Sequence, residues 1–259
     1  FLNKSEISFD FSKVEQKANQ ATRVASSTIL GECASQIENM VVMSADLANS
    51  DKTDGFLKKS KPFAKGDFSG AFLQAGVAEL TMASIANGMA LHGGIIPVCG
   101  TFFVFSDYMK PAVRMAALME LQVVYVWTHD AFRVGEDGPT HQPIEQEAQI
   151  RLLEKFKNHS GKNAMLVLRP ADVNETTVAY EMALNNTNTP TALILSRQNT
   201  PNLPNSSYSE AQKATQGAYI VKECAGKPDV ILVANGSEVA TLFEGAALLE
   251  AQKGIKTQI

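Results

Sequence analysis

Short apolar runs alternate along this chain with longer segments in which apolar residues recur at helical spacing. Expected strands cover 40–44, 95–99, 123–128, 165–168 and 192–195, and expected helices cover 13–37, 78–91, 105–119, 144–159 and 174–185. Such an alternation predicts βαβ units and therefore a doubly wound, mostly parallel α/β sheet. The segment 49–70 is rich in Lys, Asp, Ser and Gly, which predicts an exposed loop.

A Pro-, Asn- and Ser-rich stretch at 199–207 has the composition of an interdomain linker. Strand-like runs at 218–222 and 230–234, a Gly-Ser turn and a helical segment at 238–252 follow it. We therefore expect a first α/β domain in residues 1–200 and the opening of a second α/β domain in residues 201–259. The chain opens on a residue other than Met and stops within a strand-like pattern, so we expect a piece of a longer protein.

Composition and charge indicate which kinds of binding partner are improbable for this chain. The formal net charge of -4 favours neither nucleic acid nor an anionic membrane surface. No apolar run approaches the roughly 18 residues of a membrane span. Three widely spaced cysteines predict reduced thiols and a cytoplasmic protein. No cluster of His and Cys has metal-ligand spacing, so we expect no metal ligand in this chain.

The string GEDGPTHQP at 135–143 directly follows the expected strand 123–128 and its short polar extension. Ligands of α/β sheets gather beyond the carboxyl ends of the strands, so this loop is the first candidate for chemistry. It carries Asp137 and His141, and His129 lies in its lead-in. Carboxylate and imidazole groups are suited to recognising hydroxyls and to moving protons.

The other candidate residues have simpler interpretations when each is taken alone. Glu79 could be a solvated glutamate in the first turn of a helix, where the helix dipole favours it. Aromatic residues at helical spacing usually belong to a core, and isolated arginines usually lie on the surface. The candidates to which these alternatives apply are Phe102, Phe105 and Tyr108, and Arg23, Ser50 and Arg197.

Five motifs together resemble transketolase. They are GEDGPTHQP, the preceding Thr-His-Asp at 128–130, Gly-Val-Ala-Glu at 76–79, GTFFVFSDY at 100–108 and Ser-Arg-Gln-Asn at 196–199. The resemblance runs from about residue 21 to the end, with the motifs in the family's order. It implies the family's middle domain, which holds the aminopyrimidine of thiamine diphosphate, followed by the start of the third domain. The first domain, which holds the diphosphate with Mg²⁺ or Ca²⁺, has no counterpart in this sequence.

The resemblance also implies a role for each candidate. Glu79 would hydrogen-bond a ring nitrogen of the aminopyrimidine, and His141 would transfer protons near the reacting carbon. Asp137 would bind a substrate hydroxyl. The aromatic residues that would stack on the cofactor ring are Phe102, Phe105 and Tyr108, with Asp46 helping to position the cofactor. The sugar phosphate would be bound by Arg23, Ser50, His129 and Arg197, since arginine forms forked, charge-assisted hydrogen bonds with phosphate.

The implied activity is the transfer of a two-carbon ketol unit from a ketose phosphate to an aldose phosphate. Family active sites form between two subunits, so a homodimer is expected of the whole enzyme, and this piece alone should be inactive. One alternative is an enzyme similar to 1-deoxyxylulose-5-phosphate synthase, and another is a non-catalytic dimerisation or regulatory module. The sequence departs from the family at Ala78 and Leu80, where Arg and His are common, and 151–163 appears longer than usual.

Overall fold

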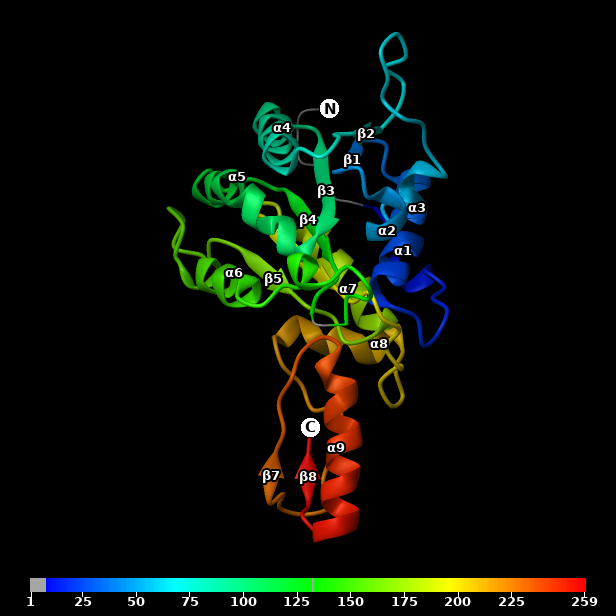
Figure 1. Cartoon of the computed structure of the whole chain (residues 1–259), viewed down its shortest axis with the longest axis vertical. Helices are drawn as coiled ribbons and strands as arrows, with labels where there is room; N and C mark the ends of the chain where they lie inside the picture. The colour runs from blue at the N-terminus through cyan, green and yellow to red at the C-terminus, as the bar shows by residue number, and fades with distance from the viewer. Residues whose placement is uncertain (1–7, 132) are drawn as a thin grey trace.

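A computed structural model describes residues 8–131 and 133–259 of the chain. Within these residues, six parallel strands form the main sheet, in the order β2-β1-β3-β4-β6-β5. The strands are β1 (Met40–Ser44), β2 (Phe72–Gln74), β3 (Ile96–Phe102), β4 (Val124–Thr128), β5 (Leu166–Leu168) and β6 (Thr191–Leu195). The predicted doubly wound, parallel α/β fold is confirmed (Figure 1).

Helices cover both faces of this sheet (Figure 1). One face carries α1 (Thr22–Gln36), α3 (Asp54–Leu57) and α7 (Val173–Asn185), and the other carries α4 (Glu79–His92), α5 (Ser106–Leu118) and α6 (Gln146–Lys155). The remaining short elements of this part are η1 (Phe11–Lys13), α2 (Ala48–Asp51), η2 (Phe103–Phe105) and η3 (Pro139–His141). Because both faces are covered, the central strands β3, β4 and β6 are buried along their whole length.

The centre of the core is aromatic. Trp127 of β4 is fully buried and stacks on Tyr125, with ring centroids 5.3 Å apart, and on Phe103, at 5.7 Å. Its indole nitrogen donates a hydrogen bond to the sulfur of Met109, 3.4 Å away. Large aromatic side chains contribute most of the buried apolar area of such a core, so this cluster fixes α5 against the sheet.

Several predicted boundaries were wrong. The helix expected from residue 13 begins at Thr22, because Asn19 adopts a left-handed backbone conformation (φ 58°) that a right-handed helix cannot contain. The expected loop 49–70 holds α2 and α3, and the edge strand β2 after it was not predicted. The helix expected over 144–159 ends at Lys155. Residues 218–222 form no strand, and 230–234 shrink to a two-residue strand.

The segment after the sheet is fixed to the first domain. Asp172 caps the N-terminus of α7 by accepting hydrogen bonds from the backbone nitrogens of Asn174 and Glu175, each at 2.9 Å. The same carboxylate accepts hydrogen bonds from the Leu203 backbone nitrogen and the Ser206 hydroxyl. The predicted linker 199–207 therefore follows one defined path over the surface.

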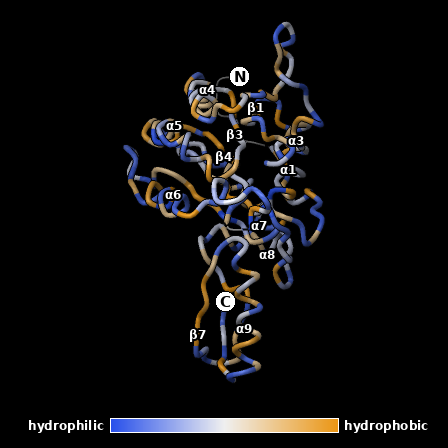
Figure 2. The backbone as a smooth tube through the Cα atoms, in the orientation of Figure 1, coloured by the Kyte–Doolittle hydropathy of each residue, from blue (hydrophilic) through white to orange (hydrophobic). Residues whose placement is uncertain are grey.

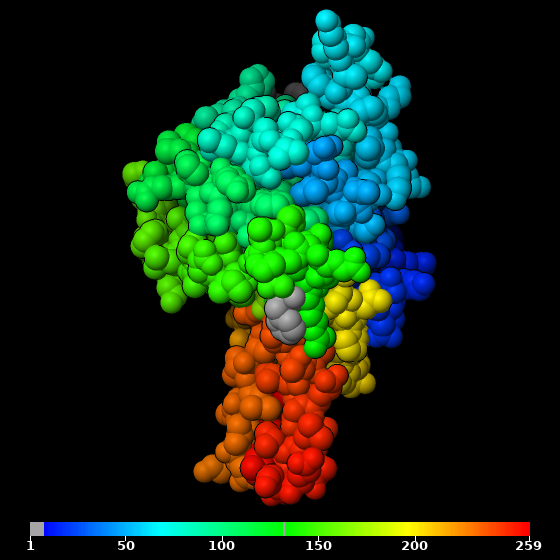
Figure 3. All heavy atoms as spheres, in the orientation of Figure 1, coloured from blue at the N-terminus to red at the C-terminus, as the bar shows by residue number. Residues whose placement is uncertain are grey.

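A second, smaller unit projects from the first (Figures 1 and 3). Its elements are β7 (Val230–Ile231), α9 (Glu238–Lys253) and β8 (Thr257–Gln258), whereas the preceding short helices α8 (Tyr208–Ala211) and η4 (Gln212–Gln216) pack against α7 of the first domain. β7 and β8 pair in parallel, with α9 between them in the chain, so this unit has the βαβ arrangement expected for a second α/β domain. Both residues of β7 are exposed.

Candidate active site

The candidate residues lie where strands of the main sheet end. Phe102 is the last residue of β3 and 103–108 follow it, residue 129 follows β4 and residue 197 follows β6, and these three strands are adjacent in the sheet. Because all strands are parallel, their carboxyl ends form one edge. Ligands bind at this edge in open α/β sheets, so the topology brings together residues far apart in the sequence.

The structure brings three predicted aromatic residues and two histidines into one row. Phe102 is buried and stacks on the His129 imidazole, with ring centroids 3.7 Å apart, and on Phe105, at 5.9 Å with nearly parallel rings. Phe105 contacts the His141 ring edge-on at 5.2 Å and the Tyr108 ring at 6.1 Å. Tyr108 is 63% exposed, so the row runs from the interior to the surface and offers ring faces to a flat ligand.

His129 is held in a strained and buried position. It adopts a left-handed backbone conformation (φ 63°), which is uncommon outside glycine, and its side chain is buried. Its Nδ1 atom lies 2.9 Å from the Thr128 hydroxyl. Burial, reinforced by the charges of Arg23 and Arg197 and by His141, lowers the pKa of His129 from 6.5 to about 3. The imidazole is therefore neutral at neutral pH, so one ring nitrogen can donate a hydrogen bond and the other can accept one.

This lowered pKa predicts that His129 makes the fold sensitive to acid. The folded chain binds a proton at His129 less readily than the unfolded chain, so stability is lost as pH falls from 6.5 towards 3. Replacing His129 with Asn, which tolerates the left-handed backbone, should make urea-derived unfolding free energy fall less steeply with decreasing pH in this window. The expected difference is about 1.4 kcal/mol per pH unit, the value of one proton. Parallel curves for the two chains would contradict the assignment.

Hydrogen bonds between α1 and the segment after β6 place two arginines side by side. The Thr22 backbone nitrogen donates to the Ser196 hydroxyl at 3.0 Å, and the Ser196 backbone nitrogen donates to the Thr22 hydroxyl at 2.7 Å. The Ala21 nitrogen donates to the Asn199 side chain at 3.0 Å. Arg23 and Arg197 follow immediately on the two segments, at the positive end of the 15-residue helix α1.

The two guanidinium groups form a cationic site with an unmet hydrogen-bonding capacity. Burial, followed by the charge of Arg197, lowers the pKa of Arg23. Arg23 donates one hydrogen bond to the Ser50 backbone oxygen at 2.5 Å, while its Nε atom is buried without a partner. Two like charges beside a helix N-terminus are stabilised by a bound anion, and the forked donors of arginine match a phosphate. The site is therefore suited to an anionic group.

The GEDGPTHQP loop folds back over this cationic site. Gly135 has a φ of 91°, and a Cβ there would lie 2.8 Å from the guanidinium carbon of Arg197, so only glycine fits. Asp137 is exposed, and its charge acts on Arg23. His141 is half-buried, with its Nδ1 atom 2.9 Å from the Thr140 hydroxyl.

Glu79 and Asp46 lie farther along the same edge. Glu79 is the first residue of α4 and is only 7% exposed. No side chain or backbone nitrogen in 8–131 or 133–259 donates a hydrogen bond to its carboxylate. Asp46 follows β1, is exposed, and has a left-handed backbone (φ 64°). The Glu79 side chain is thus largely buried, but its carboxylate oxygens are not among the buried polar atoms without a partner, so they remain accessible to a ligand.

Sequence reasoning missed a buried carboxylate that shapes this site. Asp51 accepts hydrogen bonds from the Ser44 hydroxyl at 2.7 Å and from the backbone nitrogen and hydroxyl of Thr53 at 2.8 and 2.7 Å. Burial raises its pKa. A Cβ on Gly100 of β3 would lie 2.9 Å from the Asp51 carboxylate, so a glycine in the strand lets this turn pack on the sheet. The turn presents the Ser50 carbonyl to Arg23.

Two further features concern the described part of the chain. None of its helices is both long and apolar enough to cross a lipid bilayer. Its His, Cys, Asp and Glu side chains form no group of three or more placed to hold a metal ion.

Comparison with known proteins defines the class of this chain. Residues 18–202 match the family model "Transketolase, pyrimidine binding domain", and residues 217–259 match "Transketolase-like TK C-terminal domain". The fold and these matches thus define the class of the chain as an α/β protein of the transketolase pyrimidine-binding type, followed by a segment of the C-terminal type.

Individual proteins agree with the family models. Transketolase of Aquifex aeolicus is 45% identical over 260 residues, which cover 100% of this chain and 36% of that protein. A transketolase from Pichia stipitis, solved in complex with sedoheptulose 7-phosphate, has a TM-score of 0.85 and 37% identity over 97% of this chain and 36% of that chain. The chain belongs to the transketolase family and spans about a third of the length of such relatives.

A further solved structure is described as a split-gene transketolase, an inactive β4 tetramer. It has a TM-score of 0.69 and 28% identity over 93% of this chain and 70% of that one.

Proposed function

We propose that this chain supplies the pyrimidine-binding and sugar-phosphate-binding parts of a thiamine diphosphate-dependent transketolase. The enzyme transfers a two-carbon ketol unit from a ketose phosphate to an aldose phosphate. One observation carries the proposal: the carboxyl edge of the sheet places an aromatic-imidazole row beside a cationic site with an unpartnered, buried arginine nitrogen. In this proposal residues 1–200 form the pyrimidine-binding domain, and residues 201–259 belong to the C-terminal domain.

The residues present fit the aminopyrimidine ring of the cofactor. Glu79 is a largely buried residue whose accessible carboxylate accepts no hydrogen bond from the described residues, and Phe102 and Phe105 offer parallel ring faces. In the proposal Glu79 binds a ring nitrogen, the aromatic residues orient the ring, and Asp46 assists at the end of β1. When bound, thiamine diphosphate supplies the carbanion chemistry that breaks and forms the carbon-carbon bonds.

The remaining residues would act on the substrates. Arg23 and Arg197 bind the phosphate through forked, charge-assisted hydrogen bonds, with Ser50 and the neutral imidazole of His129 completing the site. This assignment is supported by the unpartnered Nε atom of Arg23. The solved relative that holds sedoheptulose 7-phosphate shows a sugar phosphate in that protein.

Two residues of the GEDGPTHQP loop would contact the reacting end of the sugar. His141 contacts Phe105 and its side chain is partly accessible, so it can exchange protons with a substrate hydroxyl above the aromatic row. Asp137 is exposed within the electrostatic reach of Arg23, where it can accept a hydrogen bond from another hydroxyl. Together they would distinguish sugars by the orientation of their hydroxyls.

The whole enzyme would be a homodimer that completes each site with a diphosphate-binding domain and a divalent cation, Mg²⁺ or Ca²⁺. The helices α4 and α5 carry many hydrophobic residues (Figure 2). Several apolar side chains on them and just before α4 are exposed, which supports an interface there. They are Val77, Leu80, Leu91, Met115 and Leu118. The chain by itself would be inactive. In support, the split-gene relative of which it covers 70% is described as inactive.

The test is ketol transfer by an enzyme completed with the remaining family domains, in the presence of thiamine diphosphate and Mg²⁺. The proposal predicts release of glyceraldehyde 3-phosphate from xylulose 5-phosphate when an aldose phosphate is supplied. A requirement for pyruvate would indicate a synthase that resembles the deoxyxylulose phosphate enzyme instead. Absence of both turnover and cofactor binding would indicate a non-catalytic module.

A further inference from the structure

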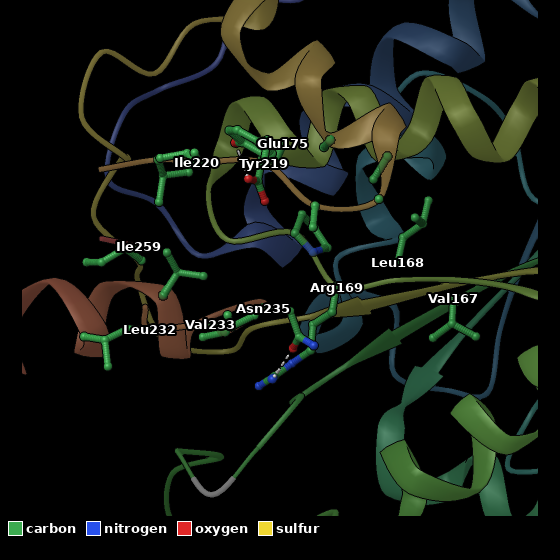
Figure 4. A pocket seen from close by; sticks show the side chains of 18 of the residues that line it. Val167, Leu168, Arg169, Glu175, Tyr219, Ile220, Leu232, Val233, Asn235 and Ile259 are labelled. Atoms are coloured by element: carbon green, nitrogen blue, oxygen red, sulfur yellow. Dashed lines mark hydrogen bonds between the residues drawn. The ribbon is translucent and has the colours of Figure 1, made fainter. Parts of the chain in front are cut away.

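Arg169 connects the main sheet to the second unit. It follows β5 directly, and its side chain is only 6% exposed. Its Nε and Nη2 atoms donate hydrogen bonds to Oδ2 of Asp130, at 3.1 and 2.7 Å. Its Nη1 atom donates to the Asn235 side-chain oxygen at 2.9 Å and lies 2.5 Å from a carboxylate oxygen of Glu238 (Figure 4). One guanidinium therefore contacts both parts of the chain.

The backbone reinforces this junction. The Gly236 nitrogen donates a hydrogen bond to the Arg169 carbonyl at 2.9 Å. Gly236 has a φ of 58°, and a Cβ there would lie 2.7 Å from the Arg169 side chain. A side chain at this position would displace the guanidinium, so the turn before α9 requires glycine.

Asp130 extends the junction to the candidate active site. Its side chain is 2% exposed, and it is the next residue after His129. Its Oδ2 atom accepts the two hydrogen bonds from Arg169 and a third from the Ser237 hydroxyl at 3.1 Å. Burial raises the pKa of Asp130, while the charge of Arg169 opposes this shift. Without Arg169 this carboxylate would be buried beside Glu238 with no cation.

Among residues 8–131 and 133–259, apolar packing between the main sheet domain and the β7-α9-β8 unit is sparse. A small cluster joins them, formed by Ala171, Leu203 and Val239 with partly buried neighbours. A cavity of about 700 Å³ lies beside it, with Arg169 and Asn235 in its wall (Figure 4). Where apolar burial is small, directional ionic hydrogen bonds determine the relative placement of two parts, and arginine is the side chain best able to form several at once.

We propose that Arg169 and Asp130 form a latch that fixes the second unit against the carboxyl edge of the sheet and holds His129 in its left-handed conformation. Both are positioning residues, since neither belongs to the aromatic row or the cationic site. The latch makes the geometry of His129 depend on the docking of residues 235–238. Only the role of His129 in binding the substrate phosphate rests on the proposed function.

The test uses the 259-residue chain with Arg169 replaced by Met, which keeps the length of the side chain and removes the guanidinium. Hydrogen exchange of the backbone amides in 234–246 should accelerate by about tenfold or more. The free energy of local opening of this segment falls, because opening no longer has to break the ionic contacts with Arg169. The ¹⁵N imidazole signals of His129 should shift, while those of the distant and exposed His92 stay in place.

Arg151→Met is the matched control. Arg151 borders the same cavity and shares Glu147 with Arg169, but its own hydrogen bonds go to α6 and β5 rather than to the second unit. This variant should change both readouts far less than Arg169→Met. A double variant, Asn235→Ala with Ser237→Ala, removes the contacts that the second unit makes with Arg169 and Asp130. Both substitutions lie outside the main sheet, so its packing is unchanged. The double variant should change both readouts in the same direction as Arg169→Met.

The proposal is overturned if hydrogen exchange in 234–246 is the same in Arg169→Met and in the double variant as in the unchanged chain. An unmoved His129 signal overturns it as well, and so does an equal response from Arg151→Met. Because neither readout needs cofactor, substrate or turnover, a failed latch is distinguishable from a failed assignment of the enzyme activity.

Discussion

Replacing Glu79 with Gln should lower the rate of ketol transfer by the completed enzyme by roughly 10²–10⁴, the range typical of a proton-transfer group. Glu79 is buried at the start of α4 and has no hydrogen-bond partner among the described residues. Glutamine keeps the shape of the side chain but cannot take part in the same proton equilibrium with a ring nitrogen. The measurement is kcat for xylulose 5-phosphate at saturating thiamine diphosphate.

Glu32→Gln is the control for this experiment. Glu32 is exposed on α1, so the same chemical change there should leave kcat unaltered. A rate for Glu79→Gln within a factor of two of the unchanged enzyme would remove Glu79 from the mechanism.

Replacing Arg23 with Ala should raise KM for phosphorylated sugars by roughly ten- to hundredfold, the value of a hydrogen bond to a charged group. The buried guanidinium has its Nε atom unpartnered and is held beside Arg197 by the contacts between α1 and the end of β6. Arg197→Ala should act in the same direction. Since the phosphate is remote from the reacting carbon, the loss should fall mainly on KM and less on kcat.

Unphosphorylated sugars provide the internal control, because they lack the group that the arginines would bind. Their KM should change little in either variant. An equal loss for phosphorylated and unphosphorylated sugars would show that Arg23 supports the fold of the site rather than the phosphate.

The sheet was predictable because its central strands carry a strong local signal. Residues 124–128, with Tyr125 and Trp127, form an unbroken buried run, and the helices around it show clear apolar spacing. The edge strand β2 was missed because three residues, paired through Phe72 to β1, carry too short a pattern. The start of α1 was missed because Asn19 is fixed by reciprocal hydrogen bonds with Asn202, a contact between distant segments.

The candidate site was predictable only where its residues carry recognisable motifs. The row of Phe102, Phe105 and Tyr108 with two histidines follows from motifs that end neighbouring strands. Asp51 and Arg169 have no such signal, since their roles arise from burial and from contacts made across the fold. A polar residue directly after a strand is the one local feature that could have indicated Arg169, which follows Leu168 at the end of β5.

The most direct test of the account is the structure of the completed enzyme with bound thiamine diphosphate. It should place a carboxylate oxygen of Glu79 about 2.6–3.2 Å from a nitrogen of the aminopyrimidine, with Phe102 and Phe105 against the ring. A bound cofactor whose pyrimidine lies out of hydrogen-bonding reach of Glu79 would contradict it.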